Sequence, residues 1–254
     1  MPPPVVAVAS GKGGVGKTSV AVGLARELVR QGLRVGLLDA DLHGPDVPRM
    51  LGIRRDVKAT SVTLTAAGGG PNAALEAVDV AGLKVASVGF LLGGDQGLTM
   101  AGQFAHLMLG RLVHQTVWGE LDVLVVDLPP GTGEIQQGLL SLSADVAVLL
   151  VVTPAEVSHL DTGRAVAVFR QAKVPLLGAV ENMAFLLCPG CGERTLLHTP
   201  APPDRTIWAL GVPRLATVPY RADAVVTGED IGPVAAAVRA HLDGPERNQA
   251  APGG

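Results

Sequence analysis

The feature that most constrains this chain is a glycine-rich loop between an apolar run and an amphipathic stretch. Residues 11–18 read GKGGVGKT, which has the glycine, lysine and threonine spacing of a phosphate-binding loop. The apolar run Val5–Ala9 precedes the loop and predicts a buried strand, and Thr18–Gln31 follows it with apolar residues on one helical face. A strand, this loop and a helix in that order predict an α/β fold that binds phosphate at the loop.

The rest of the chain repeats the alternation of strand and helix. Continuous apolar runs, typical of strands covered on both faces, occur at Arg34–Leu38, Leu83–Val88, Val123–Val126, Val146–Val152 and Pro175–Val180. Further helices are predicted at Met100–Val117, Thr162–Ala172 and Pro233–Leu242. We predict a doubly wound, mostly parallel sheet with helices on both faces, built as a single domain from residues 1–243. Residues 244–254 are polar and rich in Pro and Gly, and we predict a disordered tail.

Composition excludes several classes of protein. Apolar residues make up 48% and charged residues 17% of the 254 residues, which excludes a chain disordered over most of its length. The net charge of −3 predicts no general attraction to nucleic acid or to anionic membranes. No apolar run approaches the ~18 residues of a membrane span, and no secretory signal opens the chain. We therefore expect a cytoplasmic protein that binds neither nucleic acid nor membrane.

Each residue type in the glycine-rich loop has a defined role. Glycines let backbone N–H groups surround phosphate oxygens, and the following helix N-terminus adds partial positive charge. Lys17 is expected to reach the β- and γ-phosphates, and the Thr18 hydroxyl to ligate Mg²⁺. A glycine-rich turn that binds nothing is the alternative, which the agreement of strand, spacing and side chains disfavours. The residues predicted to contact ATP here are Gly11, Lys12, Gly13, Gly14, Val15, Gly16, Lys17, Thr18 and Ser19.

Three aspartates are candidates to complete a site for Mg²⁺ and nucleotide. Asp127 ends one predicted strand, and Asp39 and Asp41 follow another, so all three are expected at the carboxyl edge of the sheet. We predict that Asp127 holds Mg²⁺ through water, that Asp41 orients or activates the attacking water, and that Asp39 supports the metal site. Gly131 is expected to place its N–H near the γ-phosphate. The alternative is that these aspartates cap helices, and the division of roles between Asp39 and Asp41 stays open.

The chain has two cysteines, and they form one motif. Cys188 and Cys191 lie in CPGCG, which predicts a knuckle whose two thiolates converge on one metal. A closed tetrahedral thiolate site needs four ligands, so a symmetric dimer with two such pairs suits an iron–sulfur cluster or Zn²⁺. A thioredoxin-like redox pair is disfavoured because the motif does not open a helix after a strand. Two unrelated cysteines, or His198 as a third ligand, are the weaker alternatives.

Together these motifs resemble the Mrp/ApbC-type iron–sulfur cluster carrier ATPases, a family with a deviant Walker A loop. The resemblance extends from Val5 to about Asp230. Its matching segments are SGKGGVGKT at 10–18, LLDADLHGPDVPRMLG at 37–52, WGELDVLVVDLPPGTGE at 118–134, VPLLGAVENM at 174–183 and CPGCGERT at 188–195. The HGPDVPRMLG and DLPPGTGE segments are more specific than the phosphate loop. They separate this chain from relatives that position septa and partition chromosomes.

The resemblance implies roles in the nucleotide site. The family hydrolyses ATP slowly as a homodimer, and the position of Lys12 is that of a lysine that reaches the partner subunit's nucleotide. With Lys17 and Asp41, Lys12 completes the predicted catalytic set. Asn182, in ENM, corresponds to a residue that contacts the adenine, and Pro219 lies in the VPYR loop that packs against the base.

The resemblance also implies a cargo and partners. Cys188 and Cys191, in the segment 185–195, correspond to ligands of a 4Fe–4S cluster shared between two subunits and passed to recipient apoproteins, with cluster-assembly scaffolds as further partners. The sequence departs from the family pattern at 98–102 and 197–204. A positioning or partition-type ATPase and a zinc-stapled ATPase dimer remain the alternatives.

Overall fold

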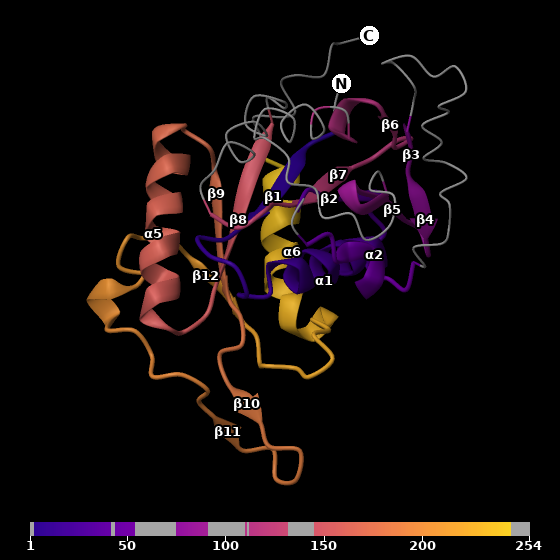
Figure 1. Ribbon diagram of the computed structural model, residues 1–254. Coiled ribbons are helices and arrows are strands. Elements are labelled where there is room, and N and C mark those ends of the chain that lie inside the picture. The colour runs from indigo at the N-terminus through magenta and orange to yellow at the C-terminus, as the bar shows by residue number, and fades with distance from the viewer. Residues whose placement is uncertain are drawn as a thin grey trace.

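The computed structural model describes residues 3–41, 44–53, 75–90, 110, 112–131 and 145–244. Its central sheet consists of β1 (Val5–Ala9), β2 (Val35–Asp39), β4 (Val78–Val80), β5 (Leu83–Ser87), β7 (Val123–Asp127), β8 (Val146–Val152), β9 (Leu176–Glu181) and β12 (Arg214–Thr217). The strand order is β12-β9-β8-β1-β7-β2-β5-β4, and only the edge pair β4–β5 is antiparallel (Figure 1). The predicted doubly wound, mostly parallel sheet is confirmed.

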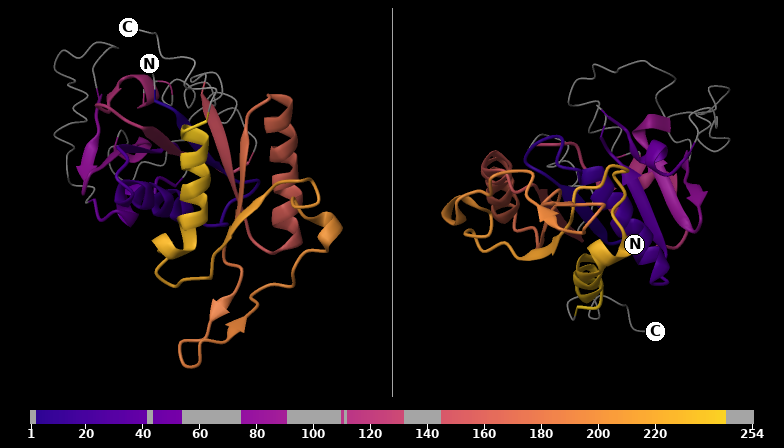
Figure 2. Two further views of the ribbon diagram at one scale, coloured as in Figure 1. Left: turned by 180° about the vertical axis from the view of Figure 1, so that it is seen from behind. Right: turned by 90° about the horizontal axis from the view of Figure 1, so that it is seen from below.

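Helices cover both faces of this sheet. The main helices are α1 (Lys17–Arg30), α5 (Glu156–Gln171) and α6 (Gly228–Leu242), with the short α2 (Val47–Met50) and the 3₁₀ turns η1 (Val88–Phe90) and η2 (Pro203–Arg205). Helices α1 and α6 pack on one face and α5 on the other (Figure 2). Alternate residues of β1 therefore enter two cores: Val6 and Val8 face α1 and α6, whereas Val5 and Ala7 face α5. Among the described residues, no helix is both long and apolar enough to cross a membrane.

Several predicted element boundaries are wrong. Within the predicted helix 100–117, residues 100–109 and 111 lie outside the described part, and Thr116–Val117 form β6, which pairs with β3 (Leu75–Glu76). Helix α6 begins at Gly228 rather than Pro233 because Thr227 and Asp230 form a capping box there. Helix α5 begins at Glu156, six residues before the predicted start. Of the predicted tail, only Gly244 is described.

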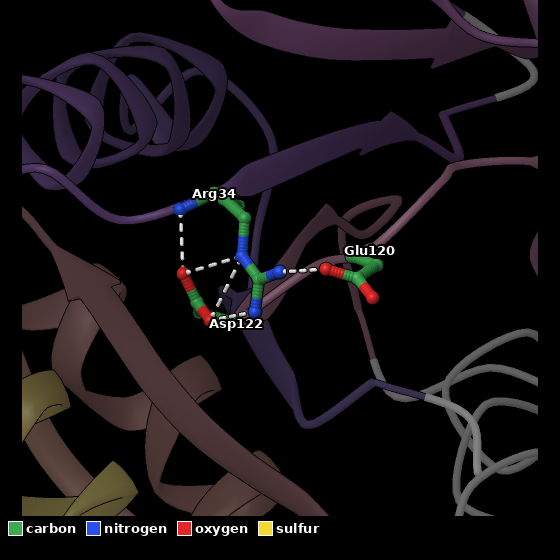
Figure 3. Close-up of polar contacts among 3 residues, drawn as sticks. All are labelled: Arg34, Glu120 and Asp122. Atoms are coloured by element: carbon green, nitrogen blue, oxygen red, sulfur yellow. Dashed lines mark hydrogen bonds and ion pairs between the residues drawn. The ribbon is translucent and has the colours of Figure 1, made fainter.

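At the amino ends of the central strands, an exposed cluster aligns β2 with β7. The Arg34 backbone N–H donates to Asp122 Oδ2 at 2.7 Å, and the Asp122 N–H donates to the Arg34 carbonyl at 2.8 Å. The Arg34 guanidinium also pairs with Asp122 and Glu120 (Figure 3). Hydrogen bonding to Arg34 lowers the pKa of Asp122. This alignment continues along the strands and sets Asp39 opposite Asp127 at their carboxyl ends.

Candidate functional site

The glycine-rich loop between β1 and α1 packs directly against α5. The Gly11 N–H donates to Thr162 Oγ1 at 3.2 Å. A Cβ at Gly11 would lie 2.2 Å from the Asp161 carbonyl carbon and 2.2 Å from the Thr162 nitrogen. Gly14 and Gly16 both adopt φ of +77°, a region that glycine occupies at little cost. Glycine is therefore required at these positions by close approach and by backbone conformation.

Asn182, the residue after β9, holds the other side of the loop. Its side-chain nitrogen donates to the Val15 carbonyl at 2.9 Å, and its backbone N–H donates to Val152 at 2.8 Å. A Cβ at Gly16 would lie 2.2 Å from the same Asn182 nitrogen. Asn182 also lines a pocket of about 190 Å³ beside the loop, with Pro219 on the pocket wall. The structure thus brings together the two residues predicted to contact the base.

Lys17, Thr18 and Asp127 form one compact constellation. Lys17 Nζ lies 2.6 Å from Asp127 Oδ1, and Thr18 Oγ1 donates to Asp127 Oδ2 at 2.6 Å. Asp127 is fully buried, and burial raises its pKa while Lys17 and Thr18 act in the opposite direction. A carboxylate beside a hydroxyl is the oxygen donor set that Mg²⁺ prefers, and the adjacent glycines leave room for phosphate. These residues fit Mg²⁺ and a nucleotide.

Asp39 and Asp41 occupy different surroundings. Asp39 is fully buried and accepts hydrogen bonds from Ser87 Oγ at 3.0 Å and from the N–H groups of Asp41 at 3.2 Å and Val47 at 3.3 Å. Burial, and secondarily the charge of Asp127, raises the pKa of Asp39 to about 8. Asp41 instead lines a second pocket, which is bounded by the glycine-rich loop and is called the phosphate pocket below. This geometry favours a role for Asp39 in positioning the Asp41 backbone and a role for Asp41 in contacting a bound substrate.

The phosphate pocket contains residues to which the sequence analysis assigned no role. Asp46 and Arg49, in and beside α2, line it together with the loop and with Lys12. Both lie in the HGPDVPRMLG segment, which indicates the family but gives neither residue a role by itself. The Gly131 N–H donates to the Ser10 carbonyl at 3.0 Å and so joins the turn after β7 to the loop, and its place near the γ-phosphate stays a prediction.

Cys188 and Cys191 lie at the turn of a hairpin formed by β10 (Leu186–Leu187) and β11 (Arg194–Thr195), which projects from the sheet (Figures 1 and 2). N–H groups of Cys191 and Gly190 donate to the Cys188 sulfur and lower the pKa of its thiol. Loop N–H groups thus point at the Cys188 sulfur, and convergence of the two thiolates on one metal stays a prediction. Within the described residues, no three His, Cys, Asp or Glu side chains are placed to share a metal. Exposed leucines flank the motif: Leu186, Leu187, Leu196 and Leu197.

A buried polar cluster connects α5 to the segment after the hairpin. His159 Nδ1 accepts the Ile207 N–H at 3.4 Å, and its ring meets Trp208 edge-on at 5.5 Å. On its other side, His159 Nε2 lies 3.9 Å from Glu181, which pairs with Arg214 at 3.1 Å. Burial, with a contribution from Arg214, lowers the pKa of His159 to about 4. His159 is therefore neutral at pH 7 and holds Ile207 as a hydrogen-bond acceptor.

We expect His159 to make folding sensitive to mild acid. Because the folded-state pKa is about 4 and the ordinary value is 6.5, the unfolded chain takes up the proton first as pH falls. The stability that neutral His159 contributes is complete above pH 6.5 and is lost between 6.5 and 4. Urea unfolding of the parent and of His159→Gln across this range should show a weaker pH dependence in the variant. Equal dependence in both proteins would contradict the assignment.

Comparison with known proteins places these features in a family context. Residues 3–247 match the model of the ParA: NUBPL iron-transfer P-loop NTPase family. The chain is 39% identical over 218 residues (85% of this chain) to the Haemophilus influenzae iron–sulfur cluster carrier protein and 39% identical over 220 residues (84%) to the Pyrococcus furiosus protein of that name. It covers 56% of the first relative and 73% of the second. The chain thus spans only about half the length of the Haemophilus relative.

A solved structure shares the whole fold. The nucleotide-binding protein of Archaeoglobus fulgidus, in complex with ADP, superposes with a TM-score of 0.70 at 30% identity. The match covers 98% of this chain and 92% of that one. That protein binds ADP on a fold that matches this one over nearly its whole length.

Proposed function

Because this chain belongs to the NUBPL iron-transfer P-loop NTPases, we propose that it hydrolyses Mg·ATP and carries an iron–sulfur cluster on a cytoplasmic homodimer. One observation carries the proposal: a group of residues that fits phosphate and Mg²⁺ lies in the same chain as two cysteines at the turn of a projecting hairpin. Lys17 Nζ and Thr18 Oγ1 each lie 2.6 Å from a carboxylate oxygen of Asp127. Cys188 and Cys191 have no third metal ligand among the described residues. Among the described residues, one chain thus supplies two of the four thiolates that a 4Fe–4S cluster needs, and in this proposal a second subunit supplies the other two.

The proposed hydrolysis is phosphoryl transfer to water, helped by positioning and charge neutralisation. The loop N–H groups and Lys17 hold the β- and γ-phosphates, and Lys12 reaches the partner subunit's nucleotide. Asp41, which lines the pocket, orients the attacking water. Bound Mg²⁺ would neutralise phosphate charge, with Thr18 and Asp127 holding it. Asp39 keeps the backbone of Asp41 in place through the N–H hydrogen bond of 3.2 Å.

The cluster is the cargo of the proposed cycle. A twofold axis beside the hairpin would bring two Cys188–Cys191 pairs together as four thiolates, enough to close a 4Fe–4S cluster. The lowered pKa of Cys188 favours the thiolate that binds metal. The exposed leucines beside the motif would exclude water from the cluster once two hairpins meet. Recipient apoproteins and cluster-assembly scaffolds then exchange the cluster at this projecting hairpin.

Anaerobic reconstitution with iron and sulfide tests the proposal. We expect iron–sulfur charge-transfer absorption, half a cluster per chain, and a dimer by size-exclusion chromatography with light scattering. Cys188→Ser and Cys191→Ser should each lose the absorption and the dimer because a thiolate ligand is gone. His198→Ala is the matched control and should keep both, since His198 joins no metal-binding group among the described residues. Stoichiometric Zn²⁺ in place of iron would instead indicate the zinc-stapled dimer.

A further inference from the structure

The pocket lined by Asn182 and Pro219 is called the base pocket here, and one of its walls continues along the chain into the cysteine hairpin. Asn182 and Met183 line the pocket, and β10 begins at Leu186. Only Ala184 and Phe185 separate the pocket from the first strand of the hairpin. The backbone path from the pocket wall to the hairpin is therefore two residues long.

Backbone hydrogen bonds tie these two residues to the opposite wall of the pocket. The Ala184 N–H donates to the Val218 carbonyl at 2.9 Å, and the Tyr220 N–H donates to the Phe185 carbonyl at 2.7 Å. Tyr220 itself lines the pocket, next to Pro219. The two walls and the root of the hairpin thus form one short ladder that extends the pairing of β9 with β12.

Met183 gives this ladder a bend. Its φ is +54°, a conformation that residues other than glycine rarely adopt. The Met183 side chain faces the loop, with its terminal methyl 3.1 Å from where a Cβ on Gly16 would lie. A base packed against Met183 would restrict a bend that the surrounding contacts already hold away from the preferred backbone regions.

We propose that the nucleoside end of the bound nucleotide, rather than its phosphates, holds the cysteine hairpin in position. A purine nucleoside seated between Met183 and Pro219 braces the existing ladder from the pocket side and so makes opening of residues 184–195 less frequent. The phosphates bind to the loop, which makes hydrogen bonds with Thr162, Asn182 and Asp127. The inference rests on the proposed nucleotide site and adds that recognition of the base controls the cysteine hairpin.

Amide hydrogen exchange, read by mass spectrometry on the metal-free full chain, tests this division. ADP and inorganic tripolyphosphate are compared, each at a saturating concentration. Both should slow exchange in the loop 11–18, because both fill the phosphate cradle. Only ADP should slow exchange in 184–195, by about tenfold or more for hydrogen-bonded amides. Equal protection of the hairpin by tripolyphosphate would overturn the inference.

Two substitutions at one position sharpen the test. Tyr220→Pro removes the N–H that donates to Phe185, whereas Tyr220→Ala removes the same side chain and keeps the N–H. ADP is raised for each variant until exchange in the loop 11–18 is slowed as in the parent, because Tyr220 lines the pocket and its loss can weaken binding. At that concentration the hairpin should be protected in the alanine variant but not in the proline variant. Hairpin protection that survives Tyr220→Pro would refute the route through the ladder. Loop protection without hairpin protection in the parent refutes the inference alone, and no protection anywhere refutes the nucleotide site as well.

Discussion

Lys17→Ala is expected to lower the rate of ATP hydrolysis by at least about 100-fold. Lys17 Nζ lies 2.6 Å from Asp127 Oδ1. In the proposed mechanism Lys17 supplies positive charge to the transferred phosphoryl group. The substitution also leaves the fully buried Asp127 without its ion pair, which should destabilise the fold by about 3 kcal/mol or more. Phosphate release and urea unfolding measure the two effects.

A double variant separates these two consequences. Lys17→Ala with Asp127→Asn removes the unpaired buried charge, so its stability should recover part of the loss while hydrolysis stays at least about 100-fold below the parent. Lys12→Ala is the matched control, because it removes a lysine from the same pocket and keeps the pair of Lys17 with Asp127. We expect Lys12→Ala to slow hydrolysis and to leave the unfolding midpoint near that of the parent. Parental hydrolysis by Lys17→Ala would refute the assigned site.

Gly11→Ala is expected to abolish nucleotide binding and to destabilise the fold by about 3 kcal/mol or more. The new Cβ would lie 2.2 Å from backbone atoms of both Asp161 and Thr162. Backbone atoms cannot rotate away as a side chain can, so either the loop or α5 must move. Truncating Thr162 would not relieve this contact. Calorimetric titration with ADP and urea unfolding give the two measurements.

Gly13→Ala is the matched control in the same loop. The nearest atom to its new Cβ is the Pro130 Cγ at 3.9 Å, an ordinary contact distance. Its stability should stay within about 0.5 kcal/mol of the parent. A Gly11→Ala protein as stable as Gly13→Ala would contradict the close packing of the loop on α5.

The elements that form the interior of the fold could be predicted from the sequence. The strands β1, β2, β5, β7, β8 and β9 were predicted to within a residue or two, because strands buried on both faces are continuously apolar. The edge strands β4 and β12 were missed. Each is short and carries polar residues, as edge strands commonly do, so neither leaves a continuous apolar signal.

The residue types of the site could also be predicted from short sequence motifs. The loop 11–18 and the C-x-x-C motif depend on residues a few positions apart, so their glycines, Lys17 and paired thiols could be read directly. The resemblance to cluster carrier ATPases is confirmed by the family match over residues 3–247. The roles of the individual site residues remain predictions for the experiments above.

What only the tertiary structure decided are contacts between residues far apart in the chain. Thr162 holds Gly11 across 151 positions, and Asn182 holds Val15 across 167. The parallel register of β2 and β7 sets Asp39 beside Asp127, where burial raises the pKa of both. Local sequence determined which groups are present, because motifs and apolar runs are short-range patterns. Their distances and burial depend on how strands and helices pack, and a linear pattern does not carry that information.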